Sequence, residues 1–424
     1  MNRFTLIRGA RQLLTLQGSS APRRGADLRN LGMIQDGSVL IADGLIREVG
    51  PTRRIENLAE ARKAEEINAH GKVVLPGFID SHTHLVSGPA RLADYEMRLA
   101  GASTDQITQA GGGWTAIYRS MQELPLRTLE AQAWRIVRDT IRQGTTTLEA
   151  RSGFGVTEAA ETKILRTHAA VNHRLGNMVS TFMAAQSLPS ELFVSNREYI
   201  DWVSTQLLPM VRRRRLAEFF DVSCEENGLT LLEARRLLVA AREQGFKLKL
   251  HAGQYWNTGG AQLAVELGAV SLDHAIYLDQ DDINALAQSR TVVNLLPGPI
   301  FYLGTQRYAP ARKLIDRGAI VALATNYNPV TCPTHNMQMI LALACTKMNM
   351  TPAEAIAACT INGAHAVGRA DSIGSIEFGK HADLVMLNVP DYREIPYHFG
   401  VNLVDMTMKT GRVIYRASEV LCFE

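Results

Sequence analysis

Two histidines, His82 and His84, stand two residues apart directly after an apolar run that extends from Val73 to Asp80. The run predicts a buried β-strand over 73–80, and residues i and i+2 of an extended chain point to the same face. Two imidazoles on one face form half of a metal site, because catalytic zinc commonly takes three protein ligands and leaves a position open for water. The alternative, a chance pair of packed or surface histidines, fits the preceding strand less well.

Further polar side chains follow later apolar runs. His251 is the expected third metal ligand, although taken alone it fits a core histidine equally well. His274 is expected to carry a proton or contact the substrate, with metal ligation as its alternative. Glu225 is a candidate base. A metal held by His82, His84 and His251 would lower the pKa of its bound water toward neutrality and so supply a nucleophile.

The middle of the chain alternates between apolar runs and segments of helical periodicity, such as 231–242. This pattern predicts a (β/α)8 barrel, in which active-site residues gather at the carboxyl ends of the strands. A doubly wound open sheet is the second choice, and the absence of a Gly-x-Gly-x-x-Gly fingerprint disfavours a nucleotide-binding fold. The expected barrel strands are 73–80, 145–150, 178–185, 220–225, 247–252, 269–274, 291–296 and 319–325.

Both ends of the chain read as short strands and turns, with Asp43-Gly44 as a hairpin signal. We therefore expect one small composite β-sandwich made from both ends. The predicted domains are residues 1–72 and 379–424 for the sandwich and 73–378 for the barrel.

Composition excludes several classes of protein. The chain has 424 residues, 46% of them hydrophobic, and a net charge of +3, which is too small to indicate a nucleic-acid or membrane partner. Five scattered cysteines indicate no disulfide framework. No signal peptide or long apolar span stands out, so we expect a cytoplasmic enzyme with a small-molecule substrate.

Several longer motifs occur along the chain. They are Leu-Pro-Gly-Phe-Ile-Asp-Ser-His-Thr-His over 75–84, Gln-Ala-Gly-Gly-Gly over 109–113, Arg-Ser-Gly-Phe-Gly over 151–155, His251-Ala252, Asn328-Pro329 and Gly-Lys-His-Ala-Asp-Leu-Val over 379–385. In these motifs the chain resembles the amidohydrolase superfamily and, within it, the imidazolonepropionases, over nearly the whole chain. The resemblance implies one divalent metal, with zinc expected and iron or manganese left open, held by His82, His84, His251 and a side chain at position 326. It also leaves a homodimer open.

The chain departs from the family pattern where the family carries acid–base groups. Asn326 replaces the ligand aspartate, Gln254 replaces the glutamate after the third histidine, and Gln186 replaces another histidine. Phe154 replaces a tyrosine, whereas Arg91, the family's anchor for a propionate, is retained. An amide cannot take a proton from water at neutral pH.

These replacements lead to our first hypothesis, the hydrolytic desulfuration of a 2-thioxo-5-oxoimidazolidine propionate to the hydantoin, because hydrosulfide leaves readily near neutral pH, whereas an amine does not. Ring C–N hydrolysis, as in an imidazolonepropionase, is the alternative. A non-catalytic binder of a heterocyclic carboxylate and a different amidohydrolase, such as a deaminase, are further alternatives. The expected catalytic residues are His274, Glu225 and Gln254, and the expected substrate contacts are Arg91, Phe154, Gln186, Asn328 and Cys332. For Cys332, a packed loop residue is the favoured interpretation.

Overall fold

The computed structural model describes residues 4–18, 21–176, 178–184, 195–225 and 228–417. Contacts divide the chain into two compact units, one of residues 1–80, 138–147 and 336–424 and the other of residues 81–137 and 148–335. The predicted boundaries 1–72, 73–378 and 379–424 stay a prediction. Within the described residues, no helix combines the length and the apolar character needed to cross a membrane.

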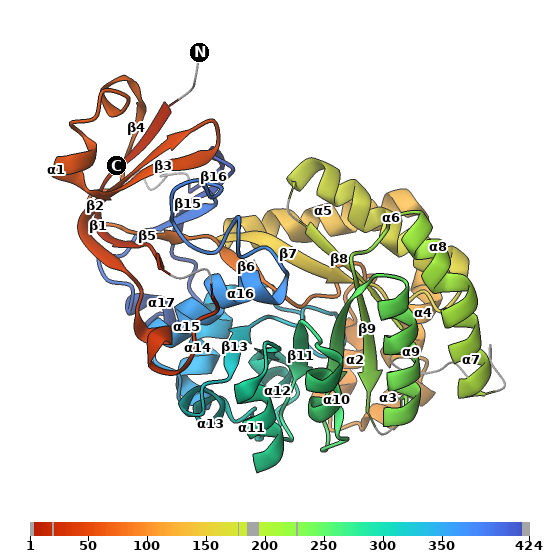
Figure 1. Ribbon diagram of the computed structural model, residues 1–424. Helices are drawn as coiled ribbons and strands as arrows, with labels where there is room; N and C mark the ends of the chain where they lie inside the picture. The colour runs from red at the N-terminus through yellow and green to blue at the C-terminus, as the bar shows by residue number, and fades with distance from the viewer. Residues whose placement is uncertain (1–3, 19–20, 177, 185–194, 226–227, 418–424) are drawn as a thin grey trace. The chain divides into compact units, whose positions relative to one another are not determined.

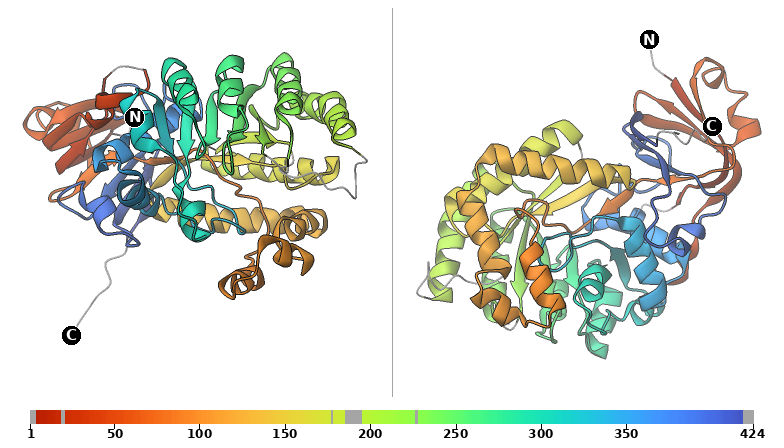
Figure 2. Two further views of the ribbon diagram at one scale, coloured as in Figure 1. Left: turned by 90° about the horizontal axis from the view of Figure 1, so that it is seen from below. Right: turned by 180° about the vertical axis from the view of Figure 1, so that it is seen from behind.

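Eight parallel strands form one sheet in the order β13-β12-β11-β10-β9-β8-β7-β6, and helices alternate with them along the chain. The predicted (β/α)8 barrel is confirmed. Helices α6, α8 and α9 lie outside β8 and β9 in Figure 1, and Figure 2 shows them from two further directions. The strands are β6 (Phe78–Asp80), β7 (Thr145–Arg151), β8 (Met178–Met183), β9 (Phe219–Cys224), β10 (Lys247–Ala252), β11 (Ser271–His274), β12 (Val292–Leu295) and β13 (Ile320–Leu323).

The helical periodicity over 231–242 corresponds to α9. This helix starts at a capping box in which the side chains of Thr230 and Glu233 each accept a hydrogen bond from the other residue's backbone N–H. The helices are α1 (Thr52–Ile55), α2 (Leu92–Leu99), α3 (Thr104–Gln109), α4 (Gly113–Glu123), α5 (Leu126–Arg142), α6 (Glu158–Leu175), α7 (Asn196–Trp202), α8 (Leu208–Arg213), α9 (Leu231–Glu243), α10 (Gly260–Leu267), α11 (Gln280–Gln288), α12 (Pro297–Tyr302), α13 (Ala311–Asp316), α14 (Met337–Met348), α15 (Pro352–Ala358), α16 (Ile361–Ala366) and α17 (Glu394–Tyr397).

The two chain ends share a second eight-stranded sheet, as predicted, in the order β16-β15-β14-β5-β1-β2-β3 with β4 beside β1. Its centre is apolar, and Ile7, Leu13 and Val39 are fully buried there. The expected Asp43-Gly44 hairpin joins β2 to β3. The strands are β1 (Phe4–Leu14), β2 (Met33–Ala42), β3 (Leu45–Pro51), β4 (Glu65–Asn68), β5 (Val73–Pro76), β14 (Leu384–Leu387), β15 (Val404–Lys409) and β16 (Arg412–Arg416).

The single strand predicted over 73–80 is in fact two strands in two sheets. β5 pairs with β1 and β14 in the terminal sheet, whereas β6 is the first strand of the barrel sheet. The break falls at Gly77, where a Cβ atom would approach the Thr146 side chain to 2.2 Å. Only glycine fits at this crossing point.

Candidate active site

The barrel closes at the histidine pair itself. The Asn326 backbone N–H donates to the His82 carbonyl oxygen at 3.0 Å, and the His84 N–H donates to the Tyr327 carbonyl at 2.8 Å. On the other side, the Arg151 N–H donates to the Thr83 carbonyl at 3.0 Å. The segment His82–His84 is therefore held between the segment that follows the eighth strand and the last residue of the second strand, at the carboxyl ends of the barrel strands.

Three buried histidines face one another in this region. His82, His251 and His274 each offer a ring nitrogen, and these atoms lie within 4.8 Å of one another. Among the described residues, His82 Nε2, His251 Nδ1, both ring nitrogens of His274 and Asn326 Oδ1 are buried without a hydrogen-bond partner. Each such atom costs about 1–3 kcal/mol unless something binds it. The donor set therefore fits a divalent metal ion.

The histidines of the site, His82, His84, His251 and His274, are neutral at neutral pH. Burial lowers the pKa of His82 to about 3 and that of His251 to about 4. Burial also lowers the pKa values of His84 and His274 well below the usual range. A neutral imidazole is the form that binds a metal, so no proton has to be displaced at neutral pH.

Gln254 holds the ring of His251. The Gln254 Oε1 atom lies 2.9 Å from His251 Nε2. Because an amide oxygen only accepts, Nε2 carries the proton and Nδ1 carries the lone pair. Nδ1 is the atom of His251 that has no partner among the described residues. The hydrogen bond to Gln254 therefore leaves the lone pair of Nδ1 available to bind a metal.

Glu225 lies at the end of β9, and 8% of its surface is exposed. Its Oε1 accepts from the Gln254 backbone N–H at 2.7 Å and its Oε2 accepts from the Tyr255 N–H at 3.3 Å. Burial raises its pKa to about 7, and these two bonds offset only part of that effect. A carboxyl group with such a pKa exchanges protons readily at neutral pH.

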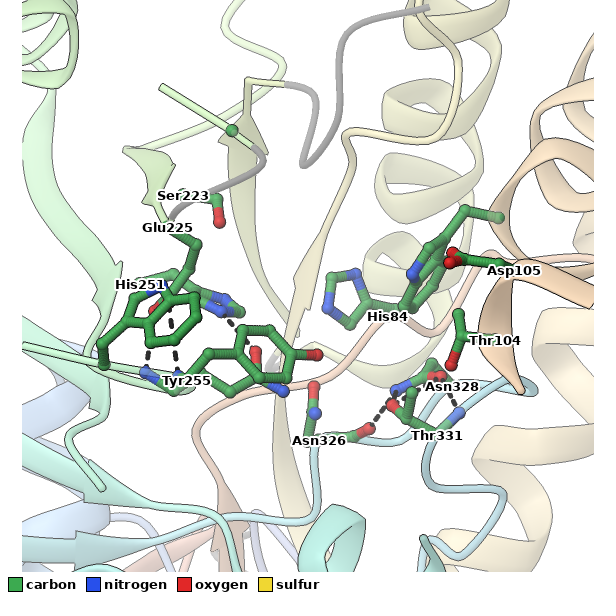
Figure 3. Close-up of a pocket in the computed structure, with 14 residues that line it drawn as sticks. His84, Thr104, Asp105, Ser223, Glu225, His251, Tyr255, Asn326, Asn328 and Thr331 are labelled. Atoms are coloured by element: carbon green, nitrogen blue, oxygen red, sulfur yellow. Dashed lines mark hydrogen bonds between the residues drawn. The ribbon is translucent and has the colours of Figure 1, made fainter. Parts of the chain in front are cut away.

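A cavity of about 490 Å³ opens beside these residues. In Figure 3, His251 and Tyr255 lie on one side of it and His84, Thr104 and Asp105 on the other, with Asn326 between them. Its size suits a small ligand. The residues lining it are His84, Thr104, Asp105, Trp114, Ser223, Glu225, Gly228, His251, Gln254, Tyr255, Trp256, Asn326, Asn328 and Thr331.

The backbone is unusual at two predicted site residues. His274 has a φ of 78° and Asn326 a φ of 56°, both in the left-handed region. Asparagine tolerates this region, whereas for histidine it costs free energy, on the order of 1–3 kcal/mol. Such strain clusters at functional sites, and here it occurs in a residue of the histidine cluster.

Phe154 lies behind His84 rather than at the cavity. The two rings stack with centroids 4.8 Å apart, and Trp114 stacks on Phe154 at 5.4 Å. The loop is fixed by the buried carboxylate of Glu161, which accepts from the N–H groups of Gly153, Gly155 and Val156. Phe154 thus supports His84 through packing.

The other predicted substrate contacts have partners of their own. Arg91 is absent from the described residues that line the cavity, and its guanidinium is paired with Asp94 at 2.8 Å. Asn328 lines the cavity, yet its Oδ1 accepts from the Thr331 N–H at 2.7 Å and its Nδ2 donates to the Asn326 carbonyl at 2.8 Å. Cys332 is fully buried and its Sγ donates to the Thr325 carbonyl. Gln186 lies outside the described residues.

Several residues that line the cavity were not predicted from the sequence. Tyr255 and Trp256 lie three and four residues after the end of β10, so their position just beyond His251 is the signal that indicates them. Ser223 lies one residue before the end of β9 and could be found in the same way. Thr104 and Asp105 begin α3, and nothing in their local sequence indicates a cavity.

The barrel, the buried histidines and the cavity at the strand ends define a metal-dependent hydrolase. The family comparison agrees, since residues 73–414 match the amidohydrolase family. The chain belongs to this family, whose members depend on a metal.

Full-length relatives support the assignment. The imidazolonepropionase of Parabacteroides distasonis is 42% identical over 414 residues, covering 97% of this chain and 99% of the relative. The imidazolonepropionase of Geobacillus kaustophilus is 43% identical over 422 residues, covering 98% of each.

Solved structures share the fold at lower identity. A triazine hydrolase variant matches with a TM-score of 0.78 at 18% identity, over 98% of this chain and 95% of that one. An adenosine deaminase from Xanthomonas campestris with bound zinc matches with a TM-score of 0.72 at 18% identity, over 99% and 94%.

Proposed function

We propose that the protein hydrolyses a five-membered, imidazolone-like ring that bears a short carboxylate side chain. The observation that carries this proposal is the cluster of His82, His251 and His274, whose unpartnered nitrogens lie beside a small-molecule cavity. The relatives named imidazolonepropionase favour cleavage of a ring C–N bond as the first candidate reaction.

We assign one divalent ion, with zinc as the expected metal, to His82 and His251. His84, His274 and Asn326 are the candidates to complete its coordination; all three are buried. When bound, such an ion supplies an activated water for attack on the ring carbon. The histidines are already neutral, and the left-handed backbone conformation of Asn326 fixes its position before the metal binds. Little conformational freedom is therefore lost on metal binding.

The chain's own groups bind the ring and move its protons. The aromatic rings of Trp114, Tyr255 and Trp256 provide flat apolar surface to a planar heterocycle. Glu225, with a pKa near 7, is placed to accept a proton from the attacking water and return it to the leaving nitrogen.

Two amides support desulfuration as a second candidate. Gln254 and Asn326 present side-chain amides to the cavity, and neither can carry a proton. In this reaction water adds to the C2 thiocarbonyl carbon, the C–S bond breaks, and the oxygen stays as a carbonyl. One proton of the added water passes to the sulfur, which then leaves as hydrosulfide, and the other is released as the C2 carbonyl forms. The products are the hydantoin propionate and hydrogen sulfide.

A side-by-side assay separates these candidates. Metal-loaded protein is incubated with the imidazolone propionate and with its 2-thioxo-5-oxo counterpart, and the opened ring and the released sulfide are both measured. We expect turnover of at least one ring. Ring opening should be the faster reaction if the chain keeps the reaction of its relatives. Sulfide release should be faster if Gln254 and Asn326 determine the reaction. Tight binding of both rings without any product would leave only a binding function and contradict the proposal.

A further inference from the structure

A group of charged residues is buried beneath the histidines. Glu149, Arg151, Asp221, Lys249 and Asp273 are all fully buried. Charged side chains are almost never fully buried unless they are paired, because removing each from water costs several kcal/mol. The free energy needed to remove these five charged side chains from water indicates that they have a specific role next to the histidines.

Arg151 connects the carboxylates of three strands. Its Nη1 lies 2.5 Å from Asp221 Oδ2 on β9, and its Nη2 lies 3.0 Å from Asp273 Oδ2 on β11. Glu149, two residues earlier on β7 and on the same face, lies 3.2 Å from Nη2. Glu149 Oε2 also accepts from the backbone N–H of Thr83, between the two histidines.

Asp273 extends this network to the histidine cluster. Its Oδ2, which contacts Arg151, also lies 2.9 Å from His82 Nδ1, and its Oδ1 accepts from Asn294 Nδ2 at 2.8 Å. The Arg151 guanidinium, 3.0 Å from Oδ2, pairs with Asp273 as a carboxylate. An ionised carboxylate only accepts, so the proton of His82 sits on Nδ1 and the lone pair on Nε2. Nε2 is the nitrogen of His82 that has no partner among the described residues.

We propose that Asp273 is a positioning residue that fixes the tautomer and ring orientation of His82, and that Arg151 holds the Asp273 carboxylate in place for this task. The inference rests on the proposed role of His82 as a metal ligand. A carboxylate behind a ligating histidine raises the basicity of the ligand and keeps its ring aimed at the ion. Asn294 donates to the other oxygen of Asp273, and its Oδ1 accepts from Ser81 Oγ at 2.9 Å. Replacing it removes buried hydrogen bonds beside His82 but keeps the charge of Asp273, so it provides the control.

The test compares Co²⁺ affinity and the Co²⁺ absorption spectrum of the full chain with those of the Asp273→Asn variant. We expect affinity to fall about 10- to 100-fold and the spectrum to change, because the charge behind His82 is lost. Asn294→Ala should bind Co²⁺ within about threefold of the parent protein. The Asp273→Asn change is then repeated in a His82→Ala background, where we expect it to have no further effect on affinity.

The double variant separates the two proposals. If His82→Ala alone leaves affinity unchanged, the metal site itself is wrong. If His82→Ala weakens binding but Asp273→Asn does not, or weakens it equally in both backgrounds, Asp273 does not act through His82 and this inference fails.

A measurement on the parent sequence does not depend on how the variants fold. In metal-free protein with ¹⁵N-labelled histidine, the His82 signal, assigned by its loss in His82→Gln, should show the proton on Nδ1. A proton on Nε2 would overturn the inference.

Discussion

The side-chain amide of Gln254 accepts a hydrogen bond from His251 Nε2 at 2.9 Å, so a neutral group occupies the position where the resemblance places a glutamate. The amide orients the ring of His251, the proposed metal ligand, but cannot relay a proton. Orientation and proton transfer, which one glutamate could combine, are therefore assigned to different residues here, with Glu225 as the candidate for the second task.

Replacing Gln254 by Glu tests this separation. The carboxylate keeps the hydrogen bond to His251 and adds a base, so ring C–N hydrolysis should rise relative to desulfuration, by up to the roughly 10²–10⁴-fold that general base catalysis provides. The ratio of kcat/KM for the two rings measures this. Gln254→Met, of similar length without an acceptor, should instead weaken metal binding. An unchanged ratio in Gln254→Glu would show that this amide does not select the reaction.

The raised pKa of Glu225 leads to a prediction for the pH dependence of kcat/KM. Because burial raises its pKa to about 7, kcat/KM should rise as pH increases through about 7 and level off above it. Glu225→Gln should abolish this rise and lower kcat/KM by about 10²–10⁴-fold. Asp105→Asn, which removes a carboxyl group across the same cavity, should keep the rise. A rise that persists in Glu225→Gln would assign the base to another group.

The same group affects folding stability in a defined direction. The folded state holds the Glu225 proton more tightly than the unfolded chain, where the pKa is 4.5. Its stabilising contribution is therefore complete below about 4.5 and is lost as pH rises through about 7. The free energy of unfolding, measured in urea from pH 4 to 8, should fall less steeply with pH in Glu225→Gln than in the parent protein.

Removing the metal should abolish turnover and lower the unfolding temperature. An ion that binds only the folded state adds about 2.7 kcal/mol of stability at a hundredfold excess over Kd. Dialysis against a chelator followed by addition of Zn²⁺, Mn²⁺ or Fe²⁺, with metal analysis and calorimetry, measures both effects and identifies the metal that restores activity. His251→Ala should show no metal-dependent shift in unfolding temperature. Full activity in metal-free protein would contradict the assignment.

Arg91 is predicted to bind the substrate's carboxylate, although it pairs with Asp94 in the structure. Exchange of this partner for the substrate is feasible because the Arg91 side chain is 22% exposed. Arg91→Met should raise KM about 10- to 100-fold with little change in kcat, since the lost interaction is made equally in the ground and transition states. A ring analogue without the carboxylate is the control and should show the same KM in both proteins.

Asn328 should act on stability more than on binding. Its side chain accepts from the Val330 and Thr331 N–H groups and donates to the Asn326 carbonyl, so it fixes the turn after β13. Asn328→Ala should lower the free energy of unfolding by about 1–3 kcal/mol, because these buried groups lose their partner. Asn328→Asp keeps the acceptor and loses the donor, so its free energy of unfolding should lie between those of the parent protein and Asn328→Ala. A large rise in KM with unchanged stability would instead make Asn328 a substrate contact.

The barrel could be predicted because its strands and helices have different periods of hydrophobicity, and the histidines could be found because they end its strands. The division of 73–80 into β5 and β6 could not, since both halves are fully buried and a continuous apolar run does not reveal which sheet receives it. Side-chain pairings differ in this respect. Arg91 and Asp94 are three residues apart, a spacing at which opposite charges pair on a helix, so this contact could be predicted. Asp273 lies 191 residues from His82, and nothing near His82 in the sequence indicates that pairing.

The hydrogen bonds that join His82 to Asn326 and His84 to Tyr327 connect the start of the barrel to its end. During synthesis the first histidines emerge long before residue 326, and closing so long a loop is among the slower steps of folding. A nascent or truncated chain that stops before this segment therefore has the histidines without the geometry that gathers them. If the proposed metal site is correct, we expect only the finished barrel to bind the ion, so that metal binding would report complete folding.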